Sequence, residues 1–165
     1  MTTFRPSARR VLATGVLLAL ASCSKPAPAP YNVEIDMATL MGHVLDPAAD
    51  IVWGASGYVL TEAGEQDLSP KTEAEWDAVE NGAATVAEVG NLLMLPGRAP
   101  EGEADWIKYS QALTAAGLKA QKSVLARDKQ GVFDTGGEIY QACVACHQQY
   151  VVGEAAASPA PKGGQ

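Results

Sequence analysis

Two cysteines and a histidine form the pattern C-x-x-C-H near the C-terminus, within the stretch YQACVACHQQY. On an α-helix, residues three and four positions apart point to the same side, so Cys143, Cys146 and His147 would share one side. Two thiols so placed can form thioether bonds to the edge of a porphyrin while the adjacent imidazole reaches the iron, and C-x-x-C-H is the attachment signature of c-type haem. We therefore predict covalent haem c, held by Cys143 and Cys146, with His147 as the proximal iron ligand.

Three other uses of these side chains stay open at this point. A zinc ion needs about four nitrogen or sulfur ligands, and His43, the only other histidine in the sequence, would be the fourth. Zinc fingers, however, separate their cysteine and histidine pairs. A thioredoxin-like redox pair is expected between a strand and a helix. A structural disulfide is the third alternative, because thiols in exported proteins normally pair.

The N-terminus has the features of an export signal. Arg5, Arg9 and Arg10 make a basic start, and an apolar run of secretory-signal length extends from Val11 to Ser22. The run ends in LASC, which resembles the lipobox of bacterial lipoproteins, in which the cysteine thiol carries lipid. We predict a lipoprotein signal peptide at residues 1–22, lipidation of Cys23, and a mature protein anchored on the periplasmic side of a bacterial membrane. An ordinary signal peptide with an incidental cysteine is the alternative.

Segments rich in proline and alanine flank the central part of the chain. The sequence SKPAPAPYN follows Cys23, and GEAAASPAPKGGQ ends the chain. Alternating proline and alanine favour an extended chain that packs poorly. We predict a tether at residues 23–31, a four-helix haem domain at residues 32–152 and a disordered tail at residues 153–165.

The charge of the mature chain is strongly negative. The sequence has 12 basic and 19 acidic residues. Removing the three arginines of the signal peptide leaves 9 basic against 19 acidic residues, a net charge of −10. Such a surface argues against nucleic acid as a partner and fits basic redox partner proteins that are met by electrostatic steering.

Apolar residues recur at helical spacing in two segments before residue 100. The first segment contains Pro47, which predicts a kink rather than two separate helices. The second begins at Thr72, which with Glu75 three residues later makes a capping box, and Pro96-Gly97 ends it. The predicted apolar faces are Met37, Leu40, Met41, Val44, Ala48, Ile51, Val52 and Ala55 in the first segment, and Trp76, Val79, Ala83, Val86, Gly90 and Leu93 in the second.

Two further helices are predicted after residue 100, and no segment indicates a strand. The last helix starts near Asp128 or, alternatively, at Thr135. Four helices with two short connections predict an all-α fold, an antiparallel four-helix bundle with covalently bound haem. The predicted faces are Trp106, Tyr109, Leu113, Ala116, Ala120 and Val124 in the third helix, and Phe133, Gly136, Tyr140, Cys143 and His147 in the fourth.

A helical bundle with C-x-x-C-H on its last helix resembles the class II c-type cytochromes, the cytochrome c-prime family. The likeness covers most of residues 32–152 and rests on TLMG in the first helix, on ACVACHQQY in the last, and on Tyr150 three residues after the histidine. The sequence departs from the family in two ways. It has no basic residue directly after Tyr150, and it has Pro47 inside the first helix.

The resemblance implies that the first helix covers the distal side of the haem. By the match of TLMG, Met41 is the candidate distal ligand, with Met37 as the alternative, while His43 falls off that face and is expected to be exposed. A methionine ligand implies a one-electron carrier in the periplasm. A five-coordinate iron that binds small gases such as NO or CO is the alternative. A homodimer is a further expectation from the family, and no motif indicates an enzyme.

Overall fold

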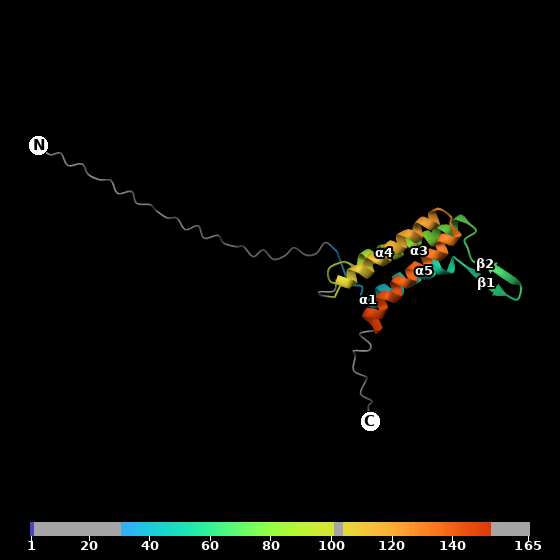
Figure 1. Ribbon diagram of the computed structural model, residues 1–165, viewed down its shortest axis with the longest axis horizontal. Coiled ribbons are helices and arrows are strands. Elements are labelled where there is room, and N and C mark those ends of the chain that lie inside the picture. The colour runs from blue at the N-terminus through green and yellow to red at the C-terminus, as the bar shows by residue number, and fades with distance from the viewer. Residues whose placement is uncertain (2–30, 101–103, 153–165) are drawn as a thin grey trace, which may run out of the picture. The chain divides into compact units, whose positions relative to one another are not determined.

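Helices make up most of the described chain in this computed structural model, which describes residues 1, 31–100 and 104–152 (Figure 1). The predicted signal peptide beyond Met1, the predicted lipidation site Cys23, most of the predicted tether and the predicted tail lie outside those ranges. Contacts divide the chain into two compact units, Met1–Asn32 and Val33–Gln165. The described helices and strands and the predicted cofactor ligands all belong to the second unit.

The first helical element is continuous but changes its winding in the middle. It consists of α1 (Met37–Leu40), a π-helical turn η1 (Met41–Leu45) and α2 (Asp46–Gly54). Asp36 caps its start, because the carboxylate accepts a hydrogen bond from the backbone N–H of Thr39 at 2.7 Å.

Pro47 explains the wide turn before it. A proline has no N–H to offer the carbonyl four residues earlier, and its ring crowds that carbonyl. The N–H of Asp46 bonds to the carbonyl oxygen of Met41, five residues back. The helix thereby absorbs the proline without ending, and the prediction of one element rather than two separate helices is confirmed. Ile51, which was predicted on the buried face, is exposed.

A β-hairpin follows α2, and the prediction that the chain has no strands is wrong. Strand β1 (Tyr58–Thr61) pairs antiparallel with β2 (Gly64–Asp67), with Tyr58 opposite Asp67 and Thr61 opposite Gly64. Aromatic and β-branched residues in YVLT favour a strand, and Gly64 takes the positive φ of 118° that the tight turn requires. Both strands are mostly exposed, so no strand face points into a core.

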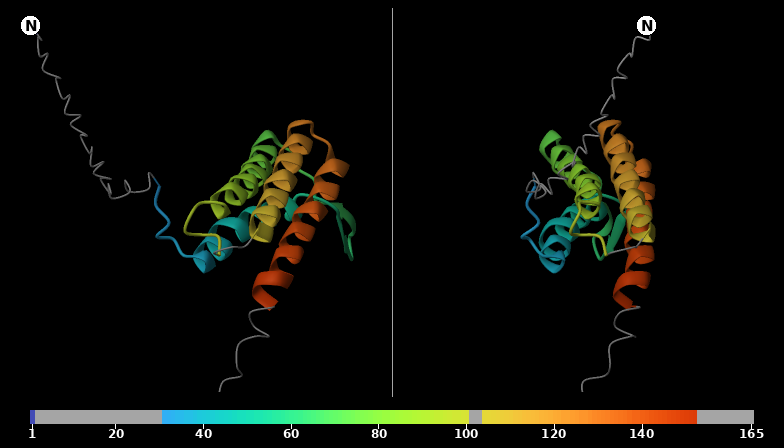
Figure 2. Two further views of the ribbon diagram at one scale, coloured as in Figure 1. Left: turned by 60° about the vertical axis from the view of Figure 1, so that its left-hand side comes forward. Right: turned by 90° about the vertical axis from the view of Figure 1, so that its left-hand side faces the viewer.

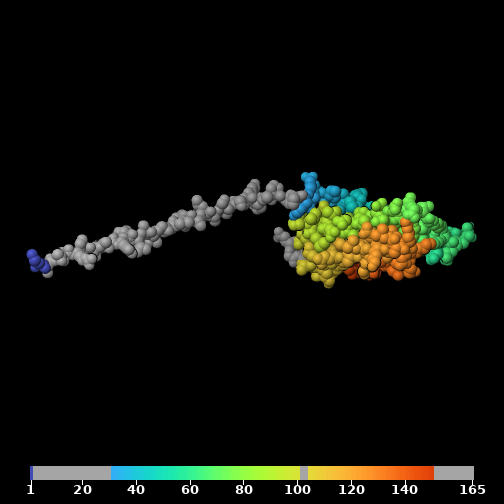
Figure 3. Space-filling view, turned by 90° about the horizontal axis from the view of Figure 1, so that it is seen from above, coloured from blue at the N-terminus to red at the C-terminus, as the bar shows by residue number. Residues whose placement is uncertain are grey.

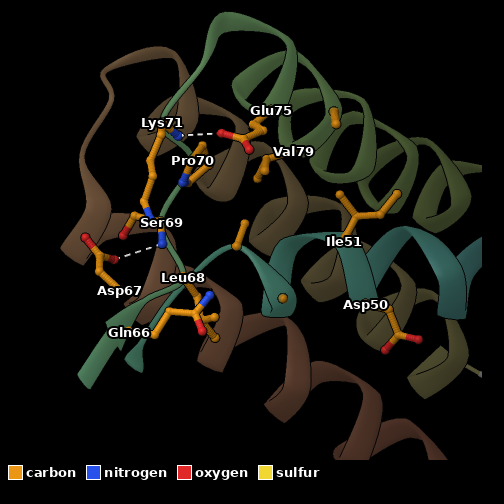
Figure 4. Close-up of a pocket in the computed structure, with 13 residues that line it drawn as sticks. Asp50, Ile51, Gln66, Asp67, Leu68, Ser69, Pro70, Lys71, Glu75 and Val79 are labelled. Carbon is orange, nitrogen blue, oxygen red and sulfur yellow. Dashed lines mark hydrogen bonds between the residues drawn. The ribbon is translucent and has the colours of Figure 1, made fainter. Parts of the chain in front are cut away.

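The segment between β2 and α3 is fastened by its own polar groups (Figure 4). The carboxylate of Asp67 accepts a hydrogen bond from the N–H of Ser69 at 2.8 Å, and the carboxylate of Glu75 accepts one from the N–H of Lys71 at 2.6 Å. Ser69 and Pro70 are buried. These contacts border a hollow of about 450 Å³ between α2, the hairpin and the start of α3, and they hold the hairpin at a defined place.

The second and third long helices match their predicted faces closely. α3 (Glu73–Leu93) begins with the predicted capping box between Thr72 and Glu75, and α4 is Ala104–Leu125. Every residue of the predicted α3 face is buried. Every residue of the predicted α4 face is also buried except Tyr109, which is half-buried. Gly90 and Gly117 allow the two helices to touch, since a Cβ at Gly117 would lie 2.5 Å from the backbone nitrogen of Ala87.

The last helix, α5 (Lys129–His147), starts directly after Asp128, which was the first of its two predicted starts. The Asp128 side chain accepts a hydrogen bond from the N–H of Gly131 at 3.0 Å. The alternative start at Thr135 is wrong, because Thr135 is buried inside the helix and its hydroxyl bonds to the carbonyl oxygen of Gly131 at 2.6 Å. A second π-helical turn, η2 (Gln148–Val152), continues the helix.

The predicted core face of α5 is only partly correct. Gly136 is buried and Cys143 is half-buried, but Phe133, Tyr140 and His147 are exposed. The core is filled by a neighbouring stripe instead, which consists of Val132, Thr135, Gly136 and Ile139. The stripe through Phe133 and Tyr140 therefore lies on the outside of the bundle.

The long helices pack in sequence order. α3 lies against α4, α4 against α5, and α2 contacts both α3 and α5, as Figure 2 shows for this bundle. Among the described residues no helix is long and apolar enough to cross a membrane. The all-α prediction thus holds for the helices, and the small hairpin is an addition to it.

Candidate cofactor site

The C-x-x-C-H residues occupy the final turns of α5. Cys143 and Cys146 are half-buried, and His147, the last residue of the helix, is exposed. Both thiols are free rather than joined in a disulfide. Because α5 is helical throughout this stretch, the three side chains leave the same side of the helix, as predicted.

A cavity of about 640 Å³ brings two of these residues together with the first helix. Cys143 and His147 line it from α5, and Met41 lines it from the π-helical turn η1. Cys146 lines a small adjoining hollow that Met41, Cys143 and His147 also border. Met37 is half-buried against the core and is not among the residues that line either space. The full lining of the cavity is Met41, Gly42, Leu45, Asp46, Ala49, Trp53, Tyr140, Cys143, Val144, His147 and Gln148.

The π-helical turn shapes the wall opposite α5. Met41, Gly42 and Leu45 all belong to η1 and all face the cavity. A Cβ at Gly42 would meet nothing within 4 Å, so this part of the wall stands clear of its neighbours. Single π turns inside helices are frequently found at functional sites. Here the turn results from Pro47, which the family resemblance had marked as a departure.

Trp53 connects α2 to α5 beside the cavity. Its indole N–H donates a hydrogen bond to the carbonyl oxygen of Gly136 at 2.9 Å. A Cβ on Gly136 would lie only 3.3 Å from the indole ring, so the glycine is what admits the tryptophan. Tyr140 meets the same indole edge to face, with ring centroids 6.3 Å apart. Trp53 was not predicted as a site residue, and its only signal in the sequence is an aromatic side chain off the predicted apolar face of its helix.

The electrostatics of the thiols do not resemble those of a redox pair. Burial, followed by the neighbouring Cys146 and Asp46, raises the pKa of the Cys143 thiol, and burial raises the pKa of the Cys146 thiol. Reactive dithiols have lowered pKa values and sit at helix N-termini or near cations. The present cysteines lie at the C-terminal end of a helix and do not follow a strand, so the thioredoxin-like alternative loses its structural basis.

Residues 31–100 and 104–150 contain no set of ligands for the zinc ion of the first alternative. No three histidine, cysteine, aspartate or glutamate side chains in that part of the chain are grouped so as to hold a metal ion. His43, its proposed fourth ligand, is exposed as expected and is not among the residues that line the cavity.

A covalently attached haem fits the residues that are present. The cavity falls within the range of about 300–1,000 Å³ that is usual for ligand pockets, and its walls are largely apolar. The Cys143 thiol and the His147 imidazole stand on one wall and the Met41 thioether on the other, while the Cys146 thiol lines the adjoining hollow. The cavity lies between facing helices, which is also where helical bundles commonly bind cofactors.

An aromatic cluster holds the chain just beyond the cysteines. The ring of Tyr150 packs edge to face against Trp106, with centroids 5.0 Å apart, and against Tyr109 at 6.2 Å. The hydroxyl of Tyr109 donates a hydrogen bond to the side chain of Gln149 at 3.1 Å. These contacts attach η2 to α4 and thereby set the end of α5 that carries His147.

No protein-family model, curated protein or solved structure matches this chain. The likeness to the cytochrome c-prime family therefore depends on the motifs in the sequence.

Proposed function

We propose that this protein is a single-haem c-type cytochrome that transfers one electron at a time on the periplasmic side of a bacterial membrane, anchored by lipid on Cys23. The observation that carries the proposal is the shared cavity. Cys143, His147 and Met41 come from two helices far apart in the sequence and line one largely apolar space of about 640 Å³.

Haem c, when bound, supplies the one-electron couple of its iron. The residues of the chain would then act as follows. Cys143 and Cys146 would hold the porphyrin edge through two thioether bonds, and His147 and Met41 would be the two side-chain ligands of the iron. A thioether ligand favours reduced iron and raises the reduction potential. The walls of the cavity are largely apolar, so they would carry few dipoles that must reorganise when the charge of the site changes.

Under this proposal the partners are redox proteins. The proposal includes neither nucleic-acid binding nor catalysis. A second candidate function is the binding of small gases by five-coordinate iron. The observation that favours it is the open space beside Gly42, where a Cβ would meet nothing within 4 Å. In that case Met41 packs against the core and leaves the distal position to NO or CO.

The decisive experiment is mass spectrometry of the full chain expressed in cells that attach haem to exported proteins. The wild-type polypeptide is expected to carry the mass of one haem and to keep its red colour after acid–organic extraction. The double variant Cys143→Ser/Cys146→Ser should lose both. Cys23→Ser is the matched control, because it removes a cysteine that is assigned to lipid, and it should keep the haem. A wild-type chain without added haem mass would end the proposal.

Visible spectra then separate the two candidate functions. Ferric protein with methionine on the iron is expected to show a weak far-red absorption band and to bind CO slowly when reduced. Rapid CO binding without that band would favour the gas-binding function.

A further inference from the structure

Large apolar side chains stand exposed on the hairpin and on the adjoining part of α5. The exposed fractions are 66% for Tyr58, 82% for Leu60 and 56% for Phe133. Tyr58 and Leu60 lie on the same face of β1, because alternate residues of a strand point to the same side. We call Tyr58, Leu60 and Phe133 the docking patch. The hairpin projects beyond the ends of the neighbouring helices (Figures 1 and 3), so a partner can reach it.

The hairpin and α5 form one surface rather than two. Asp67, which is opposite Tyr58 in the hairpin, forms an ion pair with Lys129 of α5 at 2.8 Å. Residues directly opposite each other in an antiparallel pair point to the same side, so Tyr58 lies on the side of the hairpin that faces α5. A Cβ at Gly57 would be 3.8 Å from the ring of Phe133. The strand and the helix therefore meet at these residues.

A groove leads from the docking patch to the cofactor cavity. It has a volume of about 510 Å³ and runs along α5 from Phe133 to Tyr140, with Trp53 on its other side. Trp53 and Tyr140 also line the cofactor cavity. Phe133 is ten residues before Cys143, which is about 15 Å along a helix. The edge of the docking patch at Phe133 therefore lies on the same helix as the cysteine that is proposed to hold the haem.

The rim of this surface is acidic. The hairpin segment YVLTEAGEQD carries Glu62, Glu65 and Asp67 and no basic residue. Asp134 lines the groove, and Lys129, the nearest cation on α5, is already paired with Asp67. Carboxylates around an apolar contact attract a basic partner from a distance and orient it on arrival.

We propose that the docking patch and its acidic rim receive a one-electron carrier protein whose own cofactor edge is apolar and surrounded by lysine and arginine. This inference rests on the proposed function and names the partner surface for it. Electron-transfer encounters bury little area and separate quickly, which suits a patch of three side chains. A second copy of this chain is a poorer occupant, because two acidic rims would face each other.

The test is stopped-flow electron transfer between the haem-loaded protein and a reduced basic class I cytochrome c. Glu62→Lys/Glu65→Lys should slow the second-order reaction by about tenfold at low ionic strength, and the difference should shrink as salt rises. Leu60→Ser should slow it several-fold at all salt concentrations. Glu88→Lys on α3 and Leu118→Ser on α4, which is 52% exposed, are the matched controls and should leave the rate unchanged.

A small-molecule reductant should reduce all of these variants at the same rate, which shows that the haem itself is intact. Equal rates for patch variants and controls with the basic cytochrome would overturn the docking inference while leaving the proposed function in place. Sedimentation showing a wild-type dimer that Leu60→Ser dissociates would assign the patch to self-association and would also overturn it. So would binding to anionic phospholipid vesicles that Leu60→Ser abolishes. Failure of the proposed function is distinct, since it would leave no haem spectrum to follow.

Discussion

The indole N–H of Trp53 on α2 donates a hydrogen bond to the backbone carbonyl oxygen of Gly136 on α5, at 2.9 Å. A helix carbonyl normally accepts from the N–H four residues later, so this bond adds a second donor to the carbonyl of Gly136. The two helices it joins carry the two walls of the candidate cofactor cavity. The contact therefore sets the spacing of the cavity at its end nearest the hairpin.

Neighbouring glycines in α5 provide a test of that contact. Gly136→Ala would place a Cβ 3.3 Å from the indole, whereas Gly137→Ala would meet nothing within 4 Å. Alanine inside a helix is favoured over glycine by about 1 kcal/mol. We expect Gly137→Ala to increase the free energy of unfolding by about that amount and Gly136→Ala to increase it less or to lower it, as measured by urea denaturation. Equal stabilisation by both changes would show that Trp53 is not tightly held.

The proposed methionine ligand can be tested by comparing Met41 with Met37. We expect Met41→Ala to abolish the far-red band of the ferric protein and to lower the reduction potential, because a thioether ligand favours reduced iron. Haem attachment should persist, since it depends on Cys143 and Cys146. Met37→Ala is the control, because Met37 is also half-buried in the first helix but does not line the cavity. A band that survives in Met41→Ala and disappears in Met37→Ala would reverse the assignment.

The capping box of α3 is expected to contribute measurably to stability. The hydroxyl of Thr72 accepts a hydrogen bond from the N–H of Glu75 at 3.2 Å. Replacing an N-cap threonine by alanine costs about 1 kcal/mol, so Thr72→Ala should lower the denaturation midpoint. Thr85→Ala removes a threonine from the interior of the same helix, where its hydroxyl bonds back to the carbonyl oxygen of Asn81 at 2.7 Å. That variant should be neutral or slightly stabilised.

The hairpin should loosen from α5 in acid. Hydrogen bonds from Lys129 and then from Ser69 hold the pKa of the Asp67 carboxyl well below its usual range. A carboxyl with a lowered pKa in the folded state stabilises the fold above its unfolded pKa of about 3.9, and this contribution disappears as the pH falls through the lower, folded value. Both side chains are partly exposed, so the effect should be small.

Asp67→Asn tests this pH dependence. We expect it to reduce the thermal midpoint at neutral pH and to approach the wild type as the pH falls below about 4. In a Lys129→Gln background, Asp67→Asn should have a smaller effect at neutral pH, because the ion pair is already gone. An undiminished effect in that background would assign the stabilisation to the bond with the N–H of Ser69 alone.

The sequence by itself was sufficient for elements whose signals are local. The capping box at Thr72 and the regular apolar stripe of α3 depend on residues three and four apart, and such residues become neighbours as soon as the helix forms. The start of α5 at Asp128 is a local signal of the same kind, although Thr135 offered a second one. The C-x-x-C-H motif likewise lies within two turns of one helix, and its haem assignment stays a prediction.

Only the tertiary structure determined which face of each helix packs against which neighbouring helix. Two apolar stripes run along α5, and only packing against α2 and α4 determines that Val132 and Ile139 enter the core while Phe133 and Tyr140 stay outside. Met37 and Met41 share one helical face in the sequence, but only the place where α5 crosses the first helix determines that Met41 lines the cavity. The hairpin escaped prediction because both of its faces are exposed, and the alternation that reveals a strand comes from burying one face and not the other.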